Sequence, residues 1–150
     1  MLALLAVAAL SCAGRGDGLV VGVEAHVLLV CERGVELQRH RVALGSGGSG
    51  KRREGDEKTP LGEYALGAPR PSAQFGTFVP VGYPTPAQRR LGFTGGAVGV
   101  HGPLRSARWL GRANVAVDWT LGCIAVESDE AIGRVARWLR AHPRAMIHLE

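Results

Sequence analysis

Short apolar runs separated by glycine and proline are the feature that most limits how this chain can fold. Residues 20–23 and 27–30 are aliphatic runs bounded by polar or glycine residues, and residues 35–38 alternate apolar and polar side chains. These are patterns of β-strands. With 22 Gly and 8 Pro among 150 residues, the chain is rich in turn formers. We therefore predict a single, mostly β domain with a hairpin over about 20–44.

One helix is predicted near the end of the chain, over about 128–141. Ser128 is suited to cap its N-terminus, and acidic residues follow in the first turn. Apolar residues spaced i, i+3, i+4 and i+7 form one stripe: Ile132, Val135, Ala136 and Leu139. Residues 146–149 are expected to form a last strand. Residues 45–58, rich in Gly, Ser and charge, are expected to be a surface loop, because too few residues precede them to form a separate domain.

The first segment predicts export. Residues 2–10 are apolar without a break, too short to span a bilayer but matching the core of a secretory signal. Residues 11–14 resemble a bacterial lipoprotein cleavage box, in which Cys12 becomes a lipidated first residue that attaches the protein to the membrane. A plain cleaved signal and a buried N-terminal strand are the alternatives. We therefore divide the chain into an export segment with a short linker, 1–18, and a folded domain, 19–150, located in the periplasm or cell envelope.

The charge of the chain gives little evidence about its partners. The net charge is +5, from 18 Lys and Arg against 13 Asp and Glu. Basic chains favour acidic partners, but no basic run is interleaved with aromatic residues, so nucleic acid is not an expected partner. The cysteines and His101 lack the spacing of a zinc site, so we expect no metal and no cofactor.

Two residues have the setting of a nucleophile and its base. Cys123 follows Gly122, which allows a close backbone approach, and His101 ends an apolar strand before Gly102. A thiol needs such a base, and backbone N–H groups at a glycine turn can stabilise an oxyanion. The alternative is that Cys123 is a core residue. A Cys31–Cys123 disulfide in an exported protein is also open.

The order of several motifs adds a resemblance. His101-Gly102 followed by Thr120-x-Gly122-Cys123 resembles the signature of the L,D-transpeptidase (YkuD-type) catalytic domain. Further similar motifs are Arg53-Glu54-Gly55-Asp56-x-x-Thr59-Pro60-x-Gly62-x-Tyr64, Val42-Ala43-Leu44-Gly45, Trp109-Leu110-Gly111 and Asp118-Trp119-Thr120. The resemblance covers about 19–149. It implies a mostly β, sandwich-like catalytic domain with few helices, among them the C-terminal one at about 128–141.

The resemblance also implies an activity, acyl transfer on the stem peptides of peptidoglycan. Cys123 would be the nucleophile and His101 the general acid and base. The backbone around Leu121, Gly122 and Cys123 would form the oxyanion hole. Asp118 is a candidate for orienting His101, with a backbone carbonyl as the alternative. Candidate substrate-binding residues are Gly102, Thr120, Trp119 and Arg105.

Two departures from the family pattern keep other functions open. Leu121 stands where many members have His or Asp, and Ala125 where many have Arg. A catalytically inactive cell-wall-binding module is therefore one alternative. Another is an L,D-carboxypeptidase or endopeptidase, in which water resolves the same thioester. The sequence leaves the oligomeric state open.

Overall fold

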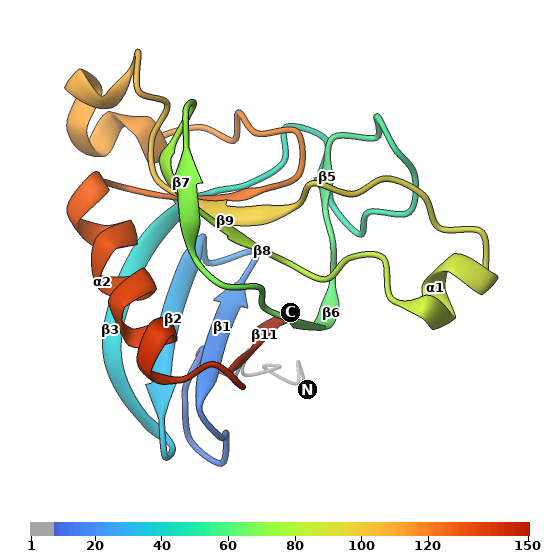
Figure 1. The fold of residues 1–150 in the computed structure, drawn as a ribbon, viewed down its shortest axis with the longest axis horizontal. Helices are drawn as coiled ribbons and strands as arrows, with labels where there is room; N and C mark the ends of the chain where they lie inside the picture. Colours follow the sequence, from blue (N-terminus) through green and yellow to red (C-terminus); the bar gives the residue numbers. More distant parts are fainter. Residues whose placement is uncertain (1–7) are drawn as a thin grey trace, which may run out of the picture.

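The computed structural model describes residues 8–150, which form a curled mixed sheet with three helices (Figure 1). Nine strands form the main sheet: β1 (Gly18–Gly22), β2 (Val27–Glu32), β3 (Val35–Ala43), β6 (Gly62–Ala65), β7 (Arg70–Ser72), β8 (Gly76–Pro80), β9 (Gly99–His101), β10 (Ile124–Val126) and β11 (Met146–Leu149). A small second sheet pairs β4 (Gly48–Ser49) with β5 (Lys58–Thr59). The helices are α1 (Pro86–Arg90), the 3₁₀ helix η1 (Arg108–Val115) and α2 (Asp129–Ala141).

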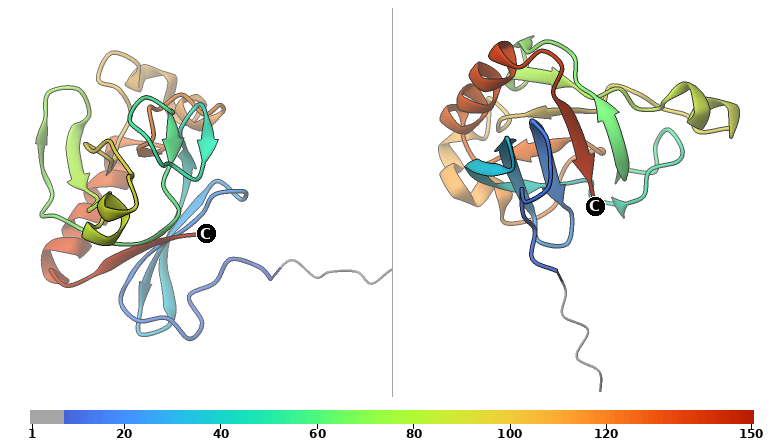
Figure 2. Two further views of the ribbon diagram at one scale, coloured as in Figure 1. Left: turned by 90° about the vertical axis from the view of Figure 1, so that its right-hand side faces the viewer. Right: turned by 90° about the horizontal axis from the view of Figure 1, so that it is seen from below.

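The long strand β3 joins the two halves of the main sheet. The strand order is β6-β11-β1-β2-β3-β10-β9-β8-β7, so β3 pairs with β2 on one side and β10 on the other. The sheet curls between these halves, which Figure 2 shows from two further directions. Apolar side chains from both halves and from α2 share one core, including Leu28, Val79 and Val135. The expected mostly β, sandwich-like architecture is confirmed.

The local predictions at the C-terminus are confirmed. Ser128 caps α2 by accepting a hydrogen bond from the Ala131 N–H at 3.1 Å. The apolar stripe of α2 is buried as its spacing predicts. The strand β11 then pairs in parallel with β1 and antiparallel with β6.

The structure differs from the sequence predictions in three places. The expected hairpin over 20–44 is a three-stranded meander, β1–β2–β3, beginning at Gly18. The proline-rich middle holds the short helix α1, which starts at a Pro after a capping box between Thr85 and Gln88. The segment 103–117, for which the sequence predicted no helix, contains η1. Residues 45–58 form a loop within the domain, as expected, stabilised by the β4–β5 pairing.

Cys12 and Cys31 form a disulfide, with their Cα atoms 5.5 Å apart. The alternative of a Cys31–Cys123 bridge is therefore wrong, and Cys123 is free. Both bridged cysteines are buried in a small cluster with Val20 and Leu29, which fixes the N-terminal segment to the sheet. A sulfur in a disulfide cannot also carry a thioether-linked lipid, so the two states of Cys12 exclude each other.

The predicted signal core lies mostly outside the described residues, which begin at residue 8. Within the described part, no helix has the length and apolarity needed to cross a bilayer.

Candidate active site

A cavity of about 870 Å³ brings the predicted nucleophile and base together. Its walls come from the loop before β5, the β7–β8 hairpin, the segment before β9 and the turn before β10. The lining residues are Lys51, Glu54, Gly55, Glu57, Arg70, Pro71, Ser72, Gln74, Phe75, Phe78, Gly95, Gly96, Ala97, Val98, His101, Leu104, Trp119, Thr120, Leu121 and Cys123. Four predicted site residues besides Cys123 are among them: His101, Trp119, Thr120 and Leu121.

The parallel pairing of β9 and β10 places the two reactive residues. Ile124 lies opposite Val100 and Ala125 opposite His101. Cys123, one residue before β10, therefore lies beside Gly99, with His101 at the end of the neighbouring strand. The pairing of these two strands therefore holds the backbones of Cys123 and His101 in a fixed register, as a Cys–His site requires.

His101 is a buried, neutral imidazole. The residue is only 1% exposed, and its ring stacks on Phe75 with centroids 3.6 Å apart. The Nδ1 atom lies 2.6 Å from the Gly102 carbonyl oxygen. Since a carbonyl only accepts, Nδ1 carries the proton and donates it there, which leaves the Nε2 lone pair free. Burial lowers the pKa of His101 to about 4, against a small opposing effect of the Gly102 hydrogen bond.

Cys123 is half-buried and rests as a thiol. Its Sγ donates to the Ala97 carbonyl at 3.5 Å, and Ala97 has a left-handed φ of 52°. Burial raises the pKa of the Cys123 thiol, while the Gly99 N–H and the positive charge of Lys51 act in the opposite direction. The resting pair is therefore a neutral thiol beside a neutral imidazole, rather than a thiolate–imidazolium ion pair.

The turn before Cys123 requires glycine, and it limits which backbone N–H groups can form the oxyanion hole. Gly122 has φ 135°, and a Cβ there would lie 2.7 Å from the Lys58 carbonyl oxygen. The Gly122 N–H donates to Thr120 Oγ1 at 3.1 Å, and that hydroxyl donates to the Cys123 carbonyl at 2.7 Å. Because the Gly122 N–H is already engaged, this geometry does not support its predicted role. The candidate donors are the N–H groups of Leu121 and Cys123.

The geometry does not support an orienting role for Asp118. Its carboxylate lies 2.9 Å from His26 Nε2 and accepts from the Leu44 N–H at 2.9 Å. It therefore joins the end of β3 to the loop before Thr120. The atom that positions His101 is the Gly102 carbonyl, which was the alternative that the sequence left open.

The other residues singled out from the sequence differ in whether they reach the cavity. Trp119 lines the cavity, and its Nε1 donates to the Asn114 carbonyl at 2.8 Å. Arg105 is not in the lining, since its guanidinium lies against the turn at Gly76. Ala125 is buried in a small cluster with Ala43 and Val115, so position 125 of this chain has an apolar surrounding.

Sequence reasoning missed Lys51 as a residue of the site. Lys51 is 6% exposed, and its Nζ donates to Asp56 Oδ1 at 2.8 Å and to the Arg53 carbonyl at 3.0 Å. Burial of Asp56 is outweighed by hydrogen bonds from Lys51 and from the N–H groups of Arg52, Arg53 and Lys58, which hold the pKa of this carboxyl well below its usual range. The Gly-Asp motif therefore positions a lysine at the cavity. One of only two lysines in the chain, placed just before that motif, was the available signal.

Arg70 and Phe75 were also missed, and no spacing in the sequence points to them. Both reach the cavity through the β7–β8 hairpin, in which Arg70 lies opposite Phe78. Within the described residues, no group of three His, Cys, Asp or Glu side chains is placed to hold a metal ion.

Comparisons with known proteins agree with this fold. Residues 16–146 match the family model described as the YkuD L,D-transpeptidase catalytic domain. Similar solved structures include the helical cell shape determining protein Pgp2 from Campylobacter jejuni, with TM-score 0.73 and 23% identity, covering 88% of this chain and 46% of that one. The L,D-transpeptidase from Xylanimonas cellulosilytica has TM-score 0.52 and 19% identity, covering 91% and 62%. That from Mycobacterium smegmatis has TM-score 0.55 and 18% identity, covering 88% and 57%.

The chain spans about half the length of Pgp2 and less than two thirds of the two transpeptidase structures. No curated protein matches the chain. The structural likeness establishes the fold, and the family model accounts for most of the sequence. The chain belongs to the family of YkuD-type L,D-transpeptidase catalytic domains.

Proposed function

We propose that this protein is a peptidoglycan L,D-transpeptidase that forms a thioester on Cys123. The observation that carries the proposal is one cavity lined by a free cysteine and a buried neutral histidine, whose Nδ1 is held by the Gly102 carbonyl. This arrangement supplies a nucleophile, a base with its lone pair free and a group that orients the base. Family membership supports acyl transfer as the chemistry.

The first step is attack of sulfur on the carbonyl of an L-centre that precedes a D-residue. The Cys123 S–H turns from the Ala97 carbonyl towards His101, and Nε2 takes the proton as the C–S bond forms. Proton transfer during attack suits a pair that is neutral at rest, because a free thiolate is not needed beforehand. The imidazolium keeps its Nδ1–H on the Gly102 carbonyl, so its orientation does not change.

The tetrahedral intermediate then collapses. Its oxyanion is stabilised by the N–H groups of Leu121 and Cys123. The C–N bond breaks, His101 returns its proton to the leaving amine, and the D-residue departs. An amine of a neighbouring stem peptide attacks the thioester and gives its proton to His101. The C–S bond then breaks, and His101 passes the proton to the departing sulfur, which restores the Cys123 thiol. The substrate places the enzyme in the cell envelope, to which residues 1–18 would export it.

The same thioester opened by water would make the protein an L,D-carboxypeptidase or endopeptidase. This second function shares every residue named above and differs only in the acceptor. The exposed side chain of Leu121 favours the transferase, because an apolar residue at the cavity does not orient a water molecule.

The test is muropeptide analysis after incubating peptidoglycan with the wild-type protein, with Cys123→Ala and with His101→Gln. We expect new cross-linked dimers with the wild type and none with either variant. A matched control is His148→Gln, which alters a half-exposed histidine of β11 and should retain activity.

Other results would replace the proposal. Shortened stems without dimers would identify a hydrolase. If wild type and Cys123→Ala leave the peptidoglycan equally unchanged, the enzyme assignment fails. Co-sedimentation with intact walls would then support the wall-binding alternative.

A further inference from the structure

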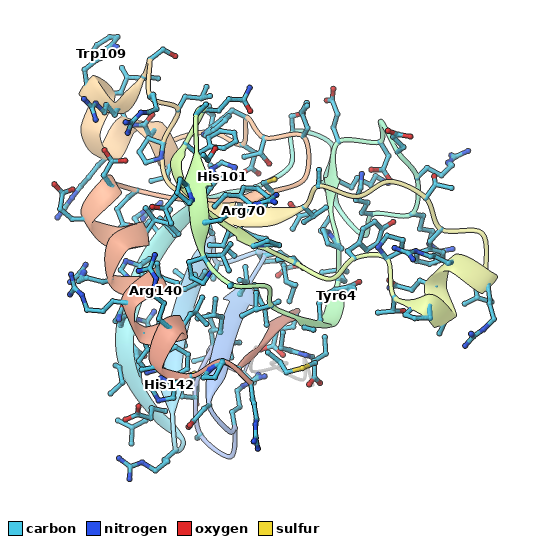
Figure 3. The ribbon with its side chains drawn as sticks, viewed as in Figure 1. Tyr64, Arg70, His101, Trp109, Arg140 and His142 are labelled. Atoms are coloured by element: carbon cyan, nitrogen blue, oxygen red, sulfur yellow. A yellow bond between two sulfur atoms is a disulfide. The ribbon has the colours of Figure 1, made fainter. Side chains whose placement is uncertain are left out.

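Trp109 is an exposed tryptophan outside the catalytic cavity, on the lobe that η1 forms. The residue is 79% exposed and is not among those that line the cavity. Figure 3 shows its side chain at the edge of the molecule, pointing away from the ribbon and well apart from His101. Exposure alone carries little weight, because single apolar side chains are common on protein surfaces. The hydrogen bonds around this one show that it is held in place.

The Trp109 ring is fixed by its own backbone. Its Nε1 donates to the Ser106 carbonyl at 3.1 Å. An indole has a single N–H donor and no acceptor, so this bond both orients the ring and engages the only polar group that it could offer a ligand. The flat face of the ring remains accessible. Because the ring is already ordered, covering it with a ligand costs little conformational entropy.

The η1 lobe is fixed relative to the catalytic cavity. Gly111 breaks η1 with φ 55° and ψ −133°, and its carbonyl accepts from Asn114 Nδ2 at 2.9 Å. Asn114 is buried, and its own carbonyl accepts from Nε1 of Trp119, which lines the cavity, at 2.8 Å. The lobe therefore presents the face of Trp109 at a set position outside the cavity.

The size and position of this surface exclude two of the three ligands that would cover an exposed ring. Within η1, the large exposed apolar side chains are Trp109 and Leu110, flanked by the exposed Arg108 and Arg112. A stable protein interface buries about 1,000 Å² or more, which two side chains do not supply. The chain enters β1 at the end of the molecule away from η1 (Figure 1), so a membrane attachment before β1 would leave Trp109 facing away from the bilayer. A sugar needs only one ring face.

We propose that Trp109 is a sugar-binding platform that holds the protein on the glycan backbone of peptidoglycan, separately from the catalytic cavity. The choice of polymer rests on the proposed function, but the ligand is the sugar chain and contains no peptide. This chain consists of N-acetylated pyranose rings. One face of a pyranose is lined by C–H bonds, which pack on the negative face of an aromatic ring. Arg108 and Arg112 supply N–H donors for the hydroxyl and N-acetyl oxygens at the edge of the sugar.

The test measures sugar binding by calorimetry with the wild-type protein. The probes are a β-1,4-linked tetramer of N-acetylglucosamine and peptidoglycan glycan strands from which an amidase has removed the stem peptides. Trp109→Leu keeps an apolar side chain but removes the ring face, and should weaken binding by about tenfold or more. Trp109→Phe restores a ring face and should retain most of the affinity. The matched control is Leu91→Ala, which removes a 77% exposed leucine after α1 and should bind like the wild type.

Salt and lipid vesicles distinguish a sugar from an anionic surface. Packing on a neutral sugar should change little with rising salt, whereas binding driven by Arg108 and Arg112 would weaken. Phosphatidylglycerol vesicles provide the anionic surface. Trp109→Leu would largely keep binding to vesicles, because leucine also inserts into a bilayer, so this variant affects the two ligands differently.

The outcomes separate the platform from the function on which it rests. The platform is overturned if the wild type binds neither glycan, or if Trp109→Leu binds glycan as tightly as the wild type. Vesicle binding without glycan binding also overturns it and assigns the lobe to lipid. If glycan binding depends on the ring at position 109 but a stem tetrapeptide never acylates Cys123, the platform stands and the proposed function fails. Circular dichroism checks that Trp109→Leu is folded.

Discussion

Replacing His101 with glutamine should remove a pH-dependent part of the stability of the fold. The pKa of His101 is lowered by burial from 6.5 to about 4 in the folded protein. Between these values the unfolded chain binds a proton that the folded protein does not, so the free energy of unfolding falls as pH falls. This contribution is fully present above pH 6.5 and is lost by about pH 4. At about 1.4 kcal/mol per pKa unit, the loss is about 3 kcal/mol.

The assay is chemical denaturation at several pH values between about 4 and 7, with wild type and His101→Gln compared at each. The variant is expected to be less stable at neutral pH and to lose less stability on acidification. Two other shifted groups act at the edges of this window. The hydrogen bond that His26 donates to Asp118 raises the pKa of His26, so its contribution is lost above pH 6.5. Despite burial, the hydrogen bond with His40 lowers the pKa of Glu127, so its contribution is lost below pH 4.5.

The matched control is His148→Gln, which changes a half-exposed histidine and should keep the wild-type pH dependence. If the difference between wild type and His101→Gln stays constant from pH 6.5 to 4, His101 is not a buried neutral base. The account of a neutral resting pair would then be refuted.

Three further predictions concern the thiol and its supports. Lys51→Met should raise the pKa of Cys123 further and slow its alkylation at neutral pH by about three- to tenfold, because a positive charge beside the thiol is lost. Gly122→Ala should lower the free energy of unfolding by about 1–3 kcal/mol, since the new Cβ meets a backbone carbonyl at φ 135°. Thiol titration of the protein purified without reductant should find one free thiol, that of Cys123, because Cys12 and Cys31 are bridged.

Each of these predictions has a control and a contrary result. Lys58→Met removes the other lysine, so equal slowing by both variants would show a general charge effect. Gly133→Ala lies in α2 with nothing near the new Cβ and should stabilise by about 0.5–1 kcal/mol; a stable, active Gly122→Ala protein would contradict the assigned strain. Two free thiols would show that Cys12 and Cys31 are not joined, the state expected if Cys12 is lipidated.

The parts of the fold that the sequence predicted are those determined locally. The apolar stripe of α2 and its Ser128 cap depend on residues a few positions apart, so their pattern is visible in the chain. Cys123 and His101 were also identified, because each lies where a short strand meets a glycine. Helix α1 was not predicted although its capping box is present in the sequence, because the prolines around it are turn formers.

The parts that could not be predicted depend on contacts between distant strands. Arg70 reaches the cavity only through the register of β7, β8 and β9, which no local pattern encodes. Asp118 was a reasonable orienting group by sequence distance, yet the fold places it against His26. The Cys12–Cys31 bridge likewise follows from the position of the N-terminal segment against β2.

The central claim is that Cys123 becomes acylated by a peptidoglycan stem peptide. The most direct measurement is the intact mass of the protein during incubation with a stem tetrapeptide, followed by peptide mapping. The account predicts an adduct equal to the donor acyl group, located on Cys123, that hydroxylamine removes and that Cys123→Ala and His101→Gln lack. Turnover of the tetrapeptide with no adduct on Cys123, or an adduct that forms equally well in His101→Gln, would contradict it.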